Sequence, residues 1–341
     1  MSCLRFQYHL PSPINFPRFY GTRYDAVAVI FKVYTDQGIV GLGEADPLNP
    51  FTEETPASVM VVTRDVIAPN LLNQNALDMA GLEYRLDRAV NGNLTARGAV
   101  NMALFDIAGK ANNIPAHLML GGRVCDNLTI FRGIESGTAQ EDAIAIEQEM
   151  EKGFHRIMIK MGASNISDEI KCMISAMDRF GDRIRFIVDA NQGWDVTEAL
   201  TFVERTKDYS PELIEQPIHR RNIEGLKRIK DRCCCCLLSA DESLVTIDDA
   251  TALIQKQAVD VFSLKVSKNG GLKKTKEIAV VAEAFGIKCL MNSMLEFGIT
   301  QAASLQVGCT LTNLVDFGYA YGSVRRMSDD VTDFGQNISG G

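Results

Sequence analysis

The chain has 341 residues, and 46% of them are hydrophobic, so it can form one large core and a smaller second unit. It carries 43 acidic and 35 basic residues, a net charge of −8, which argues against a nucleic acid or an anionic membrane as partner. No apolar stretch reaches the roughly 18 to 20 residues that a membrane-spanning helix needs, and the N-terminus does not resemble a signal peptide. We therefore expect a soluble, cytoplasmic protein.

The nine cysteines include the run Cys233–Cys236, which lacks the paired spacing and the nearby histidines of a zinc site. We expect the cysteines to be free thiols that pack as small hydrophobic side chains, with a disulfide or a metal role as the alternative.

The N-terminal part predicts a hairpin followed by helices. Two β-rich runs in residues 24–46 are joined by Asp36-Gln37-Gly38, which is typical of a hairpin with a glycine turn. The proline-rich stretch 11–23 before it is expected to be irregular, either a loop that closes over a site or a surface connection. Between residues 53 and 110 the apolar residues recur at helical spacing. Residues 1–123 are therefore expected to form an α+β capping domain.

From residue 124 onwards, short apolar runs alternate with helical patterns. The helical patterns, for example 138–152 and 272–285, have one apolar face. Eight strands are expected near 128–132, 156–160, 185–189, 212–215, 237–241, 260–265, 287–292 and 313–317. Residues 124–341 therefore predict a (β/α) TIM-like barrel, which makes the protein an α/β protein.

Five of these strands end at or next to a charged residue. The residues are Lys160, Asp189, Glu215, Asp241 and Lys265, spaced 24 to 29 positions apart. Because the carboxyl ends of barrel strands open on one face, these charges are expected to lie together where active sites are built. Neighbouring carboxylates repel unless a cation lies between them, and ligands that offer only oxygen suit Mg²⁺. The pattern therefore predicts a magnesium site.

Six motifs in this order resemble the enolase superfamily and, within it, the muconate lactonizing enzyme subgroup. They lie at Ala99–Lys110, Val188–Trp194, Ile214–Pro217, Ala240–Ser243, Leu264–Gly271 and Ser293–Gly298. The resemblance covers nearly the whole chain. It implies a capping domain over a modified TIM barrel, with Mg²⁺ at the barrel mouth. By matching position, Asp189, Glu215 and Asp241 look like the metal ligands, and Lys160 and Lys265 like the acid/base lysines.

The resemblance also marks residues around this set. Asn191 and Glu242 are adjacent to ligands and are expected to support them. Glu296 is expected to line the site, facing substrate or holding a lysine. Lys268 is expected either to supply a further charge from another strand or to be a solvated loop lysine. Asp316 is expected on the eighth strand, near the substrate.

Three departures from the subgroup matter. Met158 stands where a lysine usually precedes the acid/base lysine, so a charge that would lower the pKa of Lys160 is missing. Dipeptide epimerases of the subgroup carry Asp-x-Asp on the eighth strand, whereas here Asp316 is followed by Phe317 and Gly318, which makes dipeptides less expected substrates. Relatives usually continue past the position of Gly341, so the natural chain is expected to be longer.

The resemblance implies an isomerase that removes the α-proton of a small carboxylate to give an enediolate. We expect a racemase or epimerase of an amino-acid derivative. We also expect a homo-oligomer, since the family often forms symmetric assemblies. A muconate-type cycloisomerase is the first alternative. An acid-sugar dehydratase is the next, although no histidine follows His219. A catalytically silent relative is the last.

Overall fold

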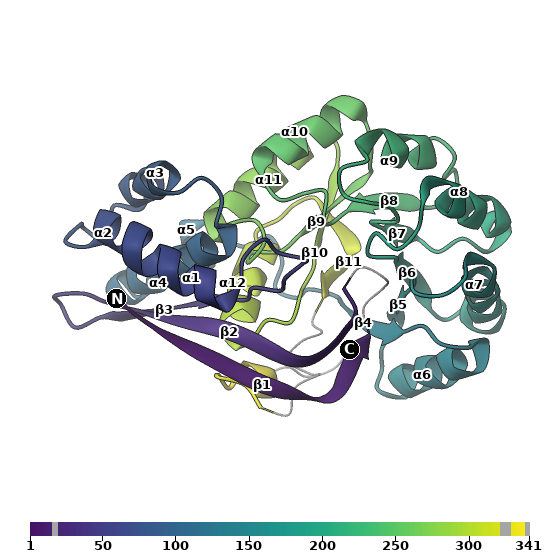
Figure 1. Ribbon diagram of the computed structural model, residues 1–341, viewed down its shortest axis with the longest axis horizontal. Helices are drawn as coiled ribbons and strands as arrows, with labels where there is room; N and C mark the ends of the chain where they lie inside the picture. Colours follow the sequence, from purple (N-terminus) through teal and green to yellow (C-terminus); the bar gives the residue numbers. More distant parts are fainter. Residues whose placement is uncertain (16–19, 321–328, 338–341) are drawn as a thin grey trace.

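The structure is a computed structural model that describes residues 1–15, 20–320 and 329–337. It contains a closed barrel of eight parallel strands and, at the N-terminal side, a three-stranded antiparallel sheet with helices (Figure 1). The predicted fold class, an α/β TIM-like barrel with an N-terminal α+β capping part, is therefore confirmed.

The capping sheet has the order β1 (Ser2–Asn15), β2 (Thr22–Tyr34) and β3 (Val40–Ala45). The hairpin predicted from the sequence is β2–β3. Strand β1 was not predicted. The stretch 11–23 was expected to be irregular, and this is wrong at both of its ends, because residues 11–15 belong to β1 and residues 22–23 to β2. Proline is tolerated because β1 is an edge strand, and its pairing with β2 is irregular between His9 and Ile14. The rest of that stretch, 16–19, lies outside the described residues.

Helices cover one face of this sheet, and the long α4 lies directly against β3. Gly41 and Gly43 allow this approach, because a Cβ atom there would lie 2.2 Å from the Ala103 carbonyl oxygen and 1.9 Å from that of Ala99. The helical segments of this part are α1 (Pro56–Val62), η1 (Thr63–Ile67), α2 (Ala68–Leu71), α3 (Met79–Ala89), α4 (Leu94–Asn112) and α5 (Ala116–Met119).

Each of the eight predicted barrel strands overlaps an observed one. The strands are β4 (Ile130–Glu135), β5 (Arg156–Lys160), β6 (Arg185–Asp189), β7 (Leu213–Glu215), β8 (Leu237–Ala240), β9 (Val261–Leu264), β10 (Lys288–Met291) and β11 (Leu314–Ala320). They close in the order β10-β11-β4-β5-β6-β7-β8-β9.

Helices surround the strands, and Figure 1 shows α6 to α11 as an outer layer in teal and green. The barrel helices are α6 (Ala139–Glu151), α7 (Ile166–Phe180), α8 (Val196–Arg205), α9 (Ile223–Lys230), α10 (Ile247–Lys256), α11 (Leu272–Ala284) and α12 (Gly298–Gly308), with short 3-10 turns η2 (Lys207–Tyr209) and η3 (Phe334–Asn337). Among the described residues, no helix combines the length and the apolar character needed to cross a bilayer.

The barrel interior is filled by side chains, so it is a packed core and not a pore. Phe131, Met158, Ile187, Leu290 and Phe317 are among the buried residues that meet there. Packing of this density fixes the strands, and it therefore holds the side chains at their carboxyl ends in place.

Buried acidic side chains join the capping sheet to the barrel. Glu44 on β3 accepts hydrogen bonds from the backbone N–H groups of Phe297 (2.6 Å) and Thr300 (3.0 Å), at the start of α12. A carboxylate at a helix N-terminus accepts hydrogen bonds from N–H groups that have no partner within the helix, and the positive end of the helix dipole stabilises its charge. Asp46 accepts from Thr300 Oγ1 at 2.8 Å. The two carboxyl groups thus attach the sheet to α12.

We expect the buried carboxyl group of Asp46 to make the stability of the folded protein depend on pH. Burial, and then the negative charge of Glu44, raise the pKa of Asp46 well above its ordinary value. A carboxyl group whose pKa is raised on folding stabilises the protein most below its unfolded pKa, and this stability is lost as the pH rises through the folded pKa. Asp46→Asn carries no charge at any pH and keeps an oxygen that can accept from Thr300. We expect Asp46→Asn to unfold at a higher temperature than the wild type at pH 8, with a gap that narrows towards pH 5. Thermal unfolding curves across this pH range measure the difference in unfolding temperature between the two proteins. A difference that does not change with pH would contradict a protonated Asp46.

The cysteine prediction is wrong for one pair. Cys233 and Cys236 form a disulfide in the segment between α9 and β8, with their Cα atoms 5.8 Å apart. The segment turns back on itself there, a geometry that composition and spacing do not reveal. Cys172 and Cys289 are free and buried, as expected of small hydrophobic side chains.

Candidate active site

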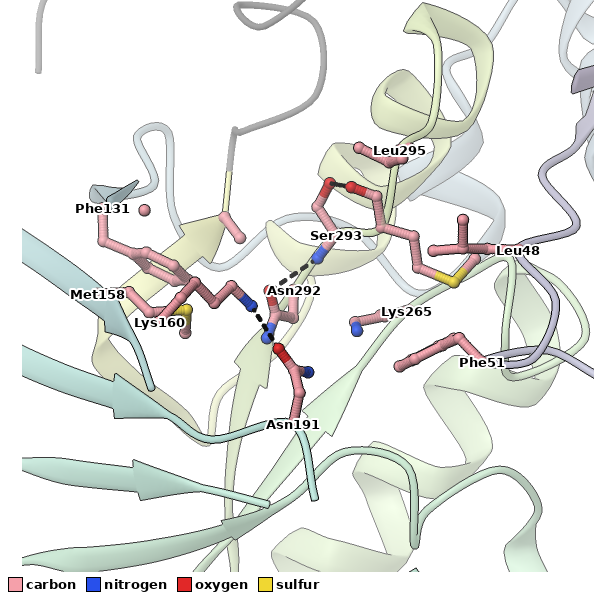
Figure 2. Close-up of a pocket in the computed structure, with 13 residues that line it drawn as sticks. Leu48, Phe51, Phe131, Met158, Lys160, Asn191, Lys265, Asn292, Ser293 and Leu295 are labelled. Carbon is pink, nitrogen blue, oxygen red and sulfur yellow. Dashed lines mark hydrogen bonds between the residues drawn. The ribbon is translucent and has the colours of Figure 1, made fainter. Parts of the chain in front are cut away.

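A cavity of about 70 Å³ lies at the carboxyl ends of the barrel strands (Figure 2). Lys160 at the end of β5 and Lys265 just after β9 both point into it. Phe51, from the segment that follows β3, closes the side next to Lys265, whose Nζ lies 4.3 Å from the centre of the phenyl ring. The capping part and the barrel therefore form the cavity together.

Lys160 is paired with Asp189 on the neighbouring strand. The two residues are in register in the β5–β6 ladder, so their side chains emerge together. Lys160 Nζ donates to Asp189 Oδ2 at 2.5 Å and to Asn191 Oδ1 at 3.1 Å. The other oxygen of Asp189 accepts from the Asn191 N–H at 2.9 Å. Asp189 is thereby held by one charged and one neutral donor.

Glu215 on β7 has one satisfied oxygen and one free oxygen. Its Oε1 accepts from Asn292 Nδ2 at 2.7 Å and from Ser263 Oγ at 3.3 Å. Its Oε2 is buried and has no hydrogen-bond partner among the described residues. Burial raises the pKa of Glu215 well above its ordinary value, and the charges of Asp189 and Asp241 add to this rise. A buried, unpartnered carboxylate oxygen is the kind of group that a bound cation satisfies.

Asp241, just after β8, is neutralised by two buried lysines. Lys265 Nζ donates to its Oδ2 at 2.6 Å, and Lys268 Nζ donates to its Oδ1 at 2.8 Å. Burial alone would raise the pKa of Asp241, but the charges of Lys265 and Lys268 lower it to about 2. Burial would likewise lower the pKa of Lys265, but Asp241 and Glu215 raise it above its ordinary value. Lys268 is therefore a buried partner of Asp241, and the alternative of a solvated loop lysine is wrong.

The three carboxylates fit Mg²⁺ by their chemistry. Asp189 and Glu215 are in register on adjacent strands, and Asp241 follows the next strand along. They offer oxygen ligands only, and Glu215 Oε2 has no other partner among the described residues. Within the described part of the chain, no three His, Cys, Asp or Glu side chains form a ready-made metal site. The ammonium groups of Lys160 and Lys265 are paired with oxygens of Asp189 and Asp241 in this arrangement.

Asn191 and Glu242 lie directly around this set, where the sequence placed them. Asn191 Nδ2 donates to Glu242 Oε1 at 3.3 Å. Burial, followed by the charges of Asp241 and Asp189, raises the pKa of Glu242 to about 7. Tyr20, a residue that the sequence did not single out, donates its hydroxyl to the same Glu242 oxygen at 2.9 Å. The sequence left open whether stretch 11–23 closes over a site or is a surface connection. At Tyr20 this stretch contacts the site.

Glu296 supports the cavity wall without lining it. It is buried and accepts from Ser293 Oγ at 2.6 Å and from the Met294 N–H at 2.7 Å. These contacts shape a loop whose residues 293–295 do line the cavity. The expectation that Glu296 itself faces the substrate or holds a lysine is not met in this arrangement.

Asp316 does not join the other predicted residues. Its carboxylate accepts from Arg185 and, at 3.4 Å, from Arg156, which begin strands β6 and β5. It therefore lies at the end of the barrel opposite the cavity. The cause is an irregular register between β10 and β11, where Cys289 pairs with Leu314 but Met291 pairs with Tyr319. Such an irregularity cannot be read from a sequence pattern.

Asn292 and Ser263 are site residues that the sequence reasoning missed. Both contact Glu215 Oε1, and Asn292 Nδ2 also donates to Ser263 Oγ at 2.9 Å. Asn292 could have been found, because it closes the apolar run of β10 as the charged residues close the other strands. His219 is exposed in the loop after β7.

A closed (β/α) barrel that gathers lysines and carboxylates at the carboxyl ends of adjacent strands has the arrangement of a barrel enzyme's active site. Comparison with protein families identifies it. Residues 141–341 match the family "Enolase C-terminal domain-like", and residues 6–121 match "Mandelate racemase / muconate lactonizing enzyme, N-terminal domain". The chain belongs to this family of the enolase superfamily.

The chain is similar to isomerases of two kinds. It is 33% identical over 280 residues to a chloromuconate cycloisomerase of Pseudomonas putida, covering 81% of this chain and 75% of the relative. It is 32% identical over 286 residues to the L-Ala-D/L-Glu epimerase of Bacillus subtilis, covering 83% and 78%. A solved dipeptide epimerase from Enterococcus faecalis, in complex with Mg and L-Leu-L-Tyr, superposes with a TM-score of 0.88 at 25% identity, covering 97% of this chain and 91% of that one. The protein is therefore an isomerase of the enolase superfamily, with relatives divided between cycloisomerases and dipeptide epimerases.

Proposed function

We propose that the protein racemises or epimerises a small amino-acid derivative: one of Lys160 and Lys265 removes the α-proton, and the other returns a proton from the opposite face. The observation that carries this proposal is that both lysines point into one cavity from different strands, beside the carboxylate cluster (Figure 2). The epimerase among the relatives supports the reaction class.

In this proposal Asp189, Glu215 and Asp241 hold Mg²⁺. When bound, Mg²⁺ balances the three carboxylates and stabilises the negative charge that develops on the substrate carboxylate as the α-proton leaves. Asn191 and Asn292 keep Asp189 and Glu215 in position by donating hydrogen bonds to them, and Glu242 in turn accepts a hydrogen bond from Asn191.

The two lysines carry out the proton transfers. One must be a neutral amine that takes the α-proton, and the electron pair of the broken C–H bond then delocalises into the substrate carboxylate. The other must be an ammonium group that returns a proton to the α-carbon from the other face. Phe51 and the packed wall exclude water from Lys265, whose side chain is only 5% exposed. Lys160 is 20% exposed, so it can exchange its proton with solvent more readily.

A muconate-type cycloisomerase is the second candidate. The similarity to chloromuconate cycloisomerases favours it. That reaction needs a proton on one face only, so one of the two lysines would be dispensable for proton transfer.

Proton NMR in deuterium oxide tests the proposal. Enzyme and Mg²⁺ are added to N-acetylated amino acids, and separately to cis,cis-muconate. Loss of the α-proton signal is the expected result, together with formation of the other enantiomer as measured by chiral chromatography of the same sample. Conversion of muconate to a lactone without any α-proton loss in the amino-acid derivatives would replace the proposal with the second candidate.

A further inference from the structure

Four consecutive cysteines, Cys233–Cys236, lie between the end of α9 and the start of β8. The segment is fixed at both ends by the backbone. The Cys233 N–H donates to the carbonyl oxygen of Ile229 at 2.9 Å, in the last turn of α9. The Leu237 N–H donates to the carbonyl oxygen of Glu212 at 2.9 Å, just before β7. The start of β8 is at the end of the barrel opposite the cavity, so this cluster of sulfur atoms is separate from the candidate active site.

Spacing along the run decides which of these cysteines can pair. The peptide bonds of the run are trans. Neighbouring Cα atoms are about 3.8 Å apart across such a bond, which is less than the roughly 4.4 to 6.8 Å that a disulfide usually spans. Cys233 and Cys236, with Cα atoms 5.8 Å apart, form the disulfide. Cys234 and Cys235 remain free thiols, and as direct neighbours they are badly placed to pair with each other.

Exposure separates these two thiols from the other free cysteines. Cys234 and Cys235 are exposed, whereas the other free cysteines are buried or partly buried. Burial raises the pKa of Cys172 to about 11 and that of Cys289 to about 12. It also raises the pKa of the partly buried thiols, which are Cys3, Cys125 and Cys309. Because the thiolate is the nucleophilic form of cysteine, the exposed pair is the most accessible and reactive part of the thiol set.

A lysine lies close to one member of the pair. Lys207, in the turn η2, is exposed and pairs with Glu204 at 3.0 Å. The hydrogen bond from Lys207 to Glu204 is the main cause that raises the pKa of Lys207, and the charge of an ionised Cys235 adds to the rise. The two side chains are therefore near enough for the ammonium group to stabilise a thiolate at Cys235.

We propose that Cys234 and Cys235 form a modification site that takes a small disulfide of the glutathione class, with Cys235 as the preferred nucleophile. The Cys235 thiolate attacks one sulfur of the small disulfide and forms a new sulfur–sulfur bond with it. The original bond of the small disulfide breaks, and its other half leaves as a thiolate. An excess of the small thiol reverses the reaction by attacking the mixed disulfide.

The arrangement of the run makes the mixed disulfide persistent. Removal of the attached group from within the chain would need a second thiolate that can form a disulfide with Cys235. Cys234 is the direct neighbour of Cys235 and is badly placed for this bond. The sulfur atoms of Cys233 and Cys236 are already joined to each other. The attached group therefore stays until a thiol from solution removes it.

Oxidised glutathione added to the native protein tests this proposal. The reaction is stopped with acid, the mass of the intact chain is measured, and the attachment point is found by peptide mapping without reductant. We expect the first glutathione on each chain to be attached within the exposed pair, mostly to Cys235, and reduced glutathione to remove it. The double variant Cys234→Ser, Cys235→Ser should keep the wild-type unfolding temperature and should not be modified.

Three results would overturn the proposal. One is attachment at the wild-type rate in the double variant. Another is attachment to Cys233 or Cys236 in the wild type. The third is a disulfide-linked dimer in place of the adduct, which would make a second copy of the chain the partner.

Lysine variants test the preference for Cys235. Lys207→Ala should slow attachment to Cys235 by about two- to fivefold, as expected for the loss of an exposed charge, and Lys207→Arg should restore it. Lys171→Ala is the matched control, because Lys171 is also an exposed lysine paired with a carboxylate three residues before it. An unchanged rate in Lys207→Ala would contradict a thiolate stabilised at Cys235.

Discussion

Replacing Lys160 or Lys265 with alanine is expected to lower kcat for racemisation by about 10²- to 10⁴-fold, the usual contribution of a general acid or base. Each variant lacks one of the two groups that line the cavity from different strands, so the proton cannot be taken from one face and returned to the other. Chiral chromatography of the product measures racemisation. Asp241 keeps Lys268 as a partner in Lys265→Ala, so the barrel is expected to stay folded.

Proton exchange separates the two lysines more sharply than turnover does. In deuterium oxide, each alanine variant should still exchange the α-proton of the one enantiomer whose proton faces the remaining lysine, and the two variants should prefer opposite enantiomers. Lys171→Ala removes an exposed lysine far from the cavity and is the matched control, with unchanged rates expected. If either active-site variant racemised at the wild-type rate, the two-base mechanism would be wrong.

Glu215→Gln is expected to abolish the stabilisation of the protein by Mg²⁺ while raising the stability of the metal-free protein. Saturating Mg²⁺, at about 100 times its Kd, should add about 2.7 kcal/mol to the free energy of unfolding of the wild type. The amide keeps an oxygen for Asn292 but removes a charge that burial and two neighbouring carboxylates disfavour. Thermal unfolding with and without Mg²⁺ measures both effects.

Two further variants control for this result. Glu169→Gln changes a buried carboxylate outside the cavity, where it accepts from Trp194 Nε1, and should keep the Mg²⁺ effect. Asp241→Asn should instead destabilise the metal-free protein, by about 3 to 5 kcal/mol, because Lys265 and Lys268 lose their charged partner. A Glu215→Gln protein that still gains stability from Mg²⁺ would remove Glu215 from the ligand set.

The position of Tyr20 shows why the capping part matters to the site. Its hydroxyl reaches Glu242, and its ring lies 5.9 Å from that of Phe51, which covers Lys265. The N-terminal segment and the barrel ends are thus in direct contact, although more than 200 residues separate Tyr20 from Glu242 along the chain.

The repeating features of this protein were predictable from local sequence patterns. Local apolar runs predicted the barrel strands and the hairpin β2–β3. The points where the barrel runs end predicted a cluster of charged residues, namely Lys160, Asp189, Glu215, Asp241 and Lys265. Contacts between residues that are distant along the chain became known from the three-dimensional structure. In the structure, Tyr20 lies against Glu242, and Asp316 lies at the end of the barrel opposite the cavity. Met158 and other apolar side chains line the cavity. These contacts depend on strand register and on the packing of distant segments, which local periodicity does not specify.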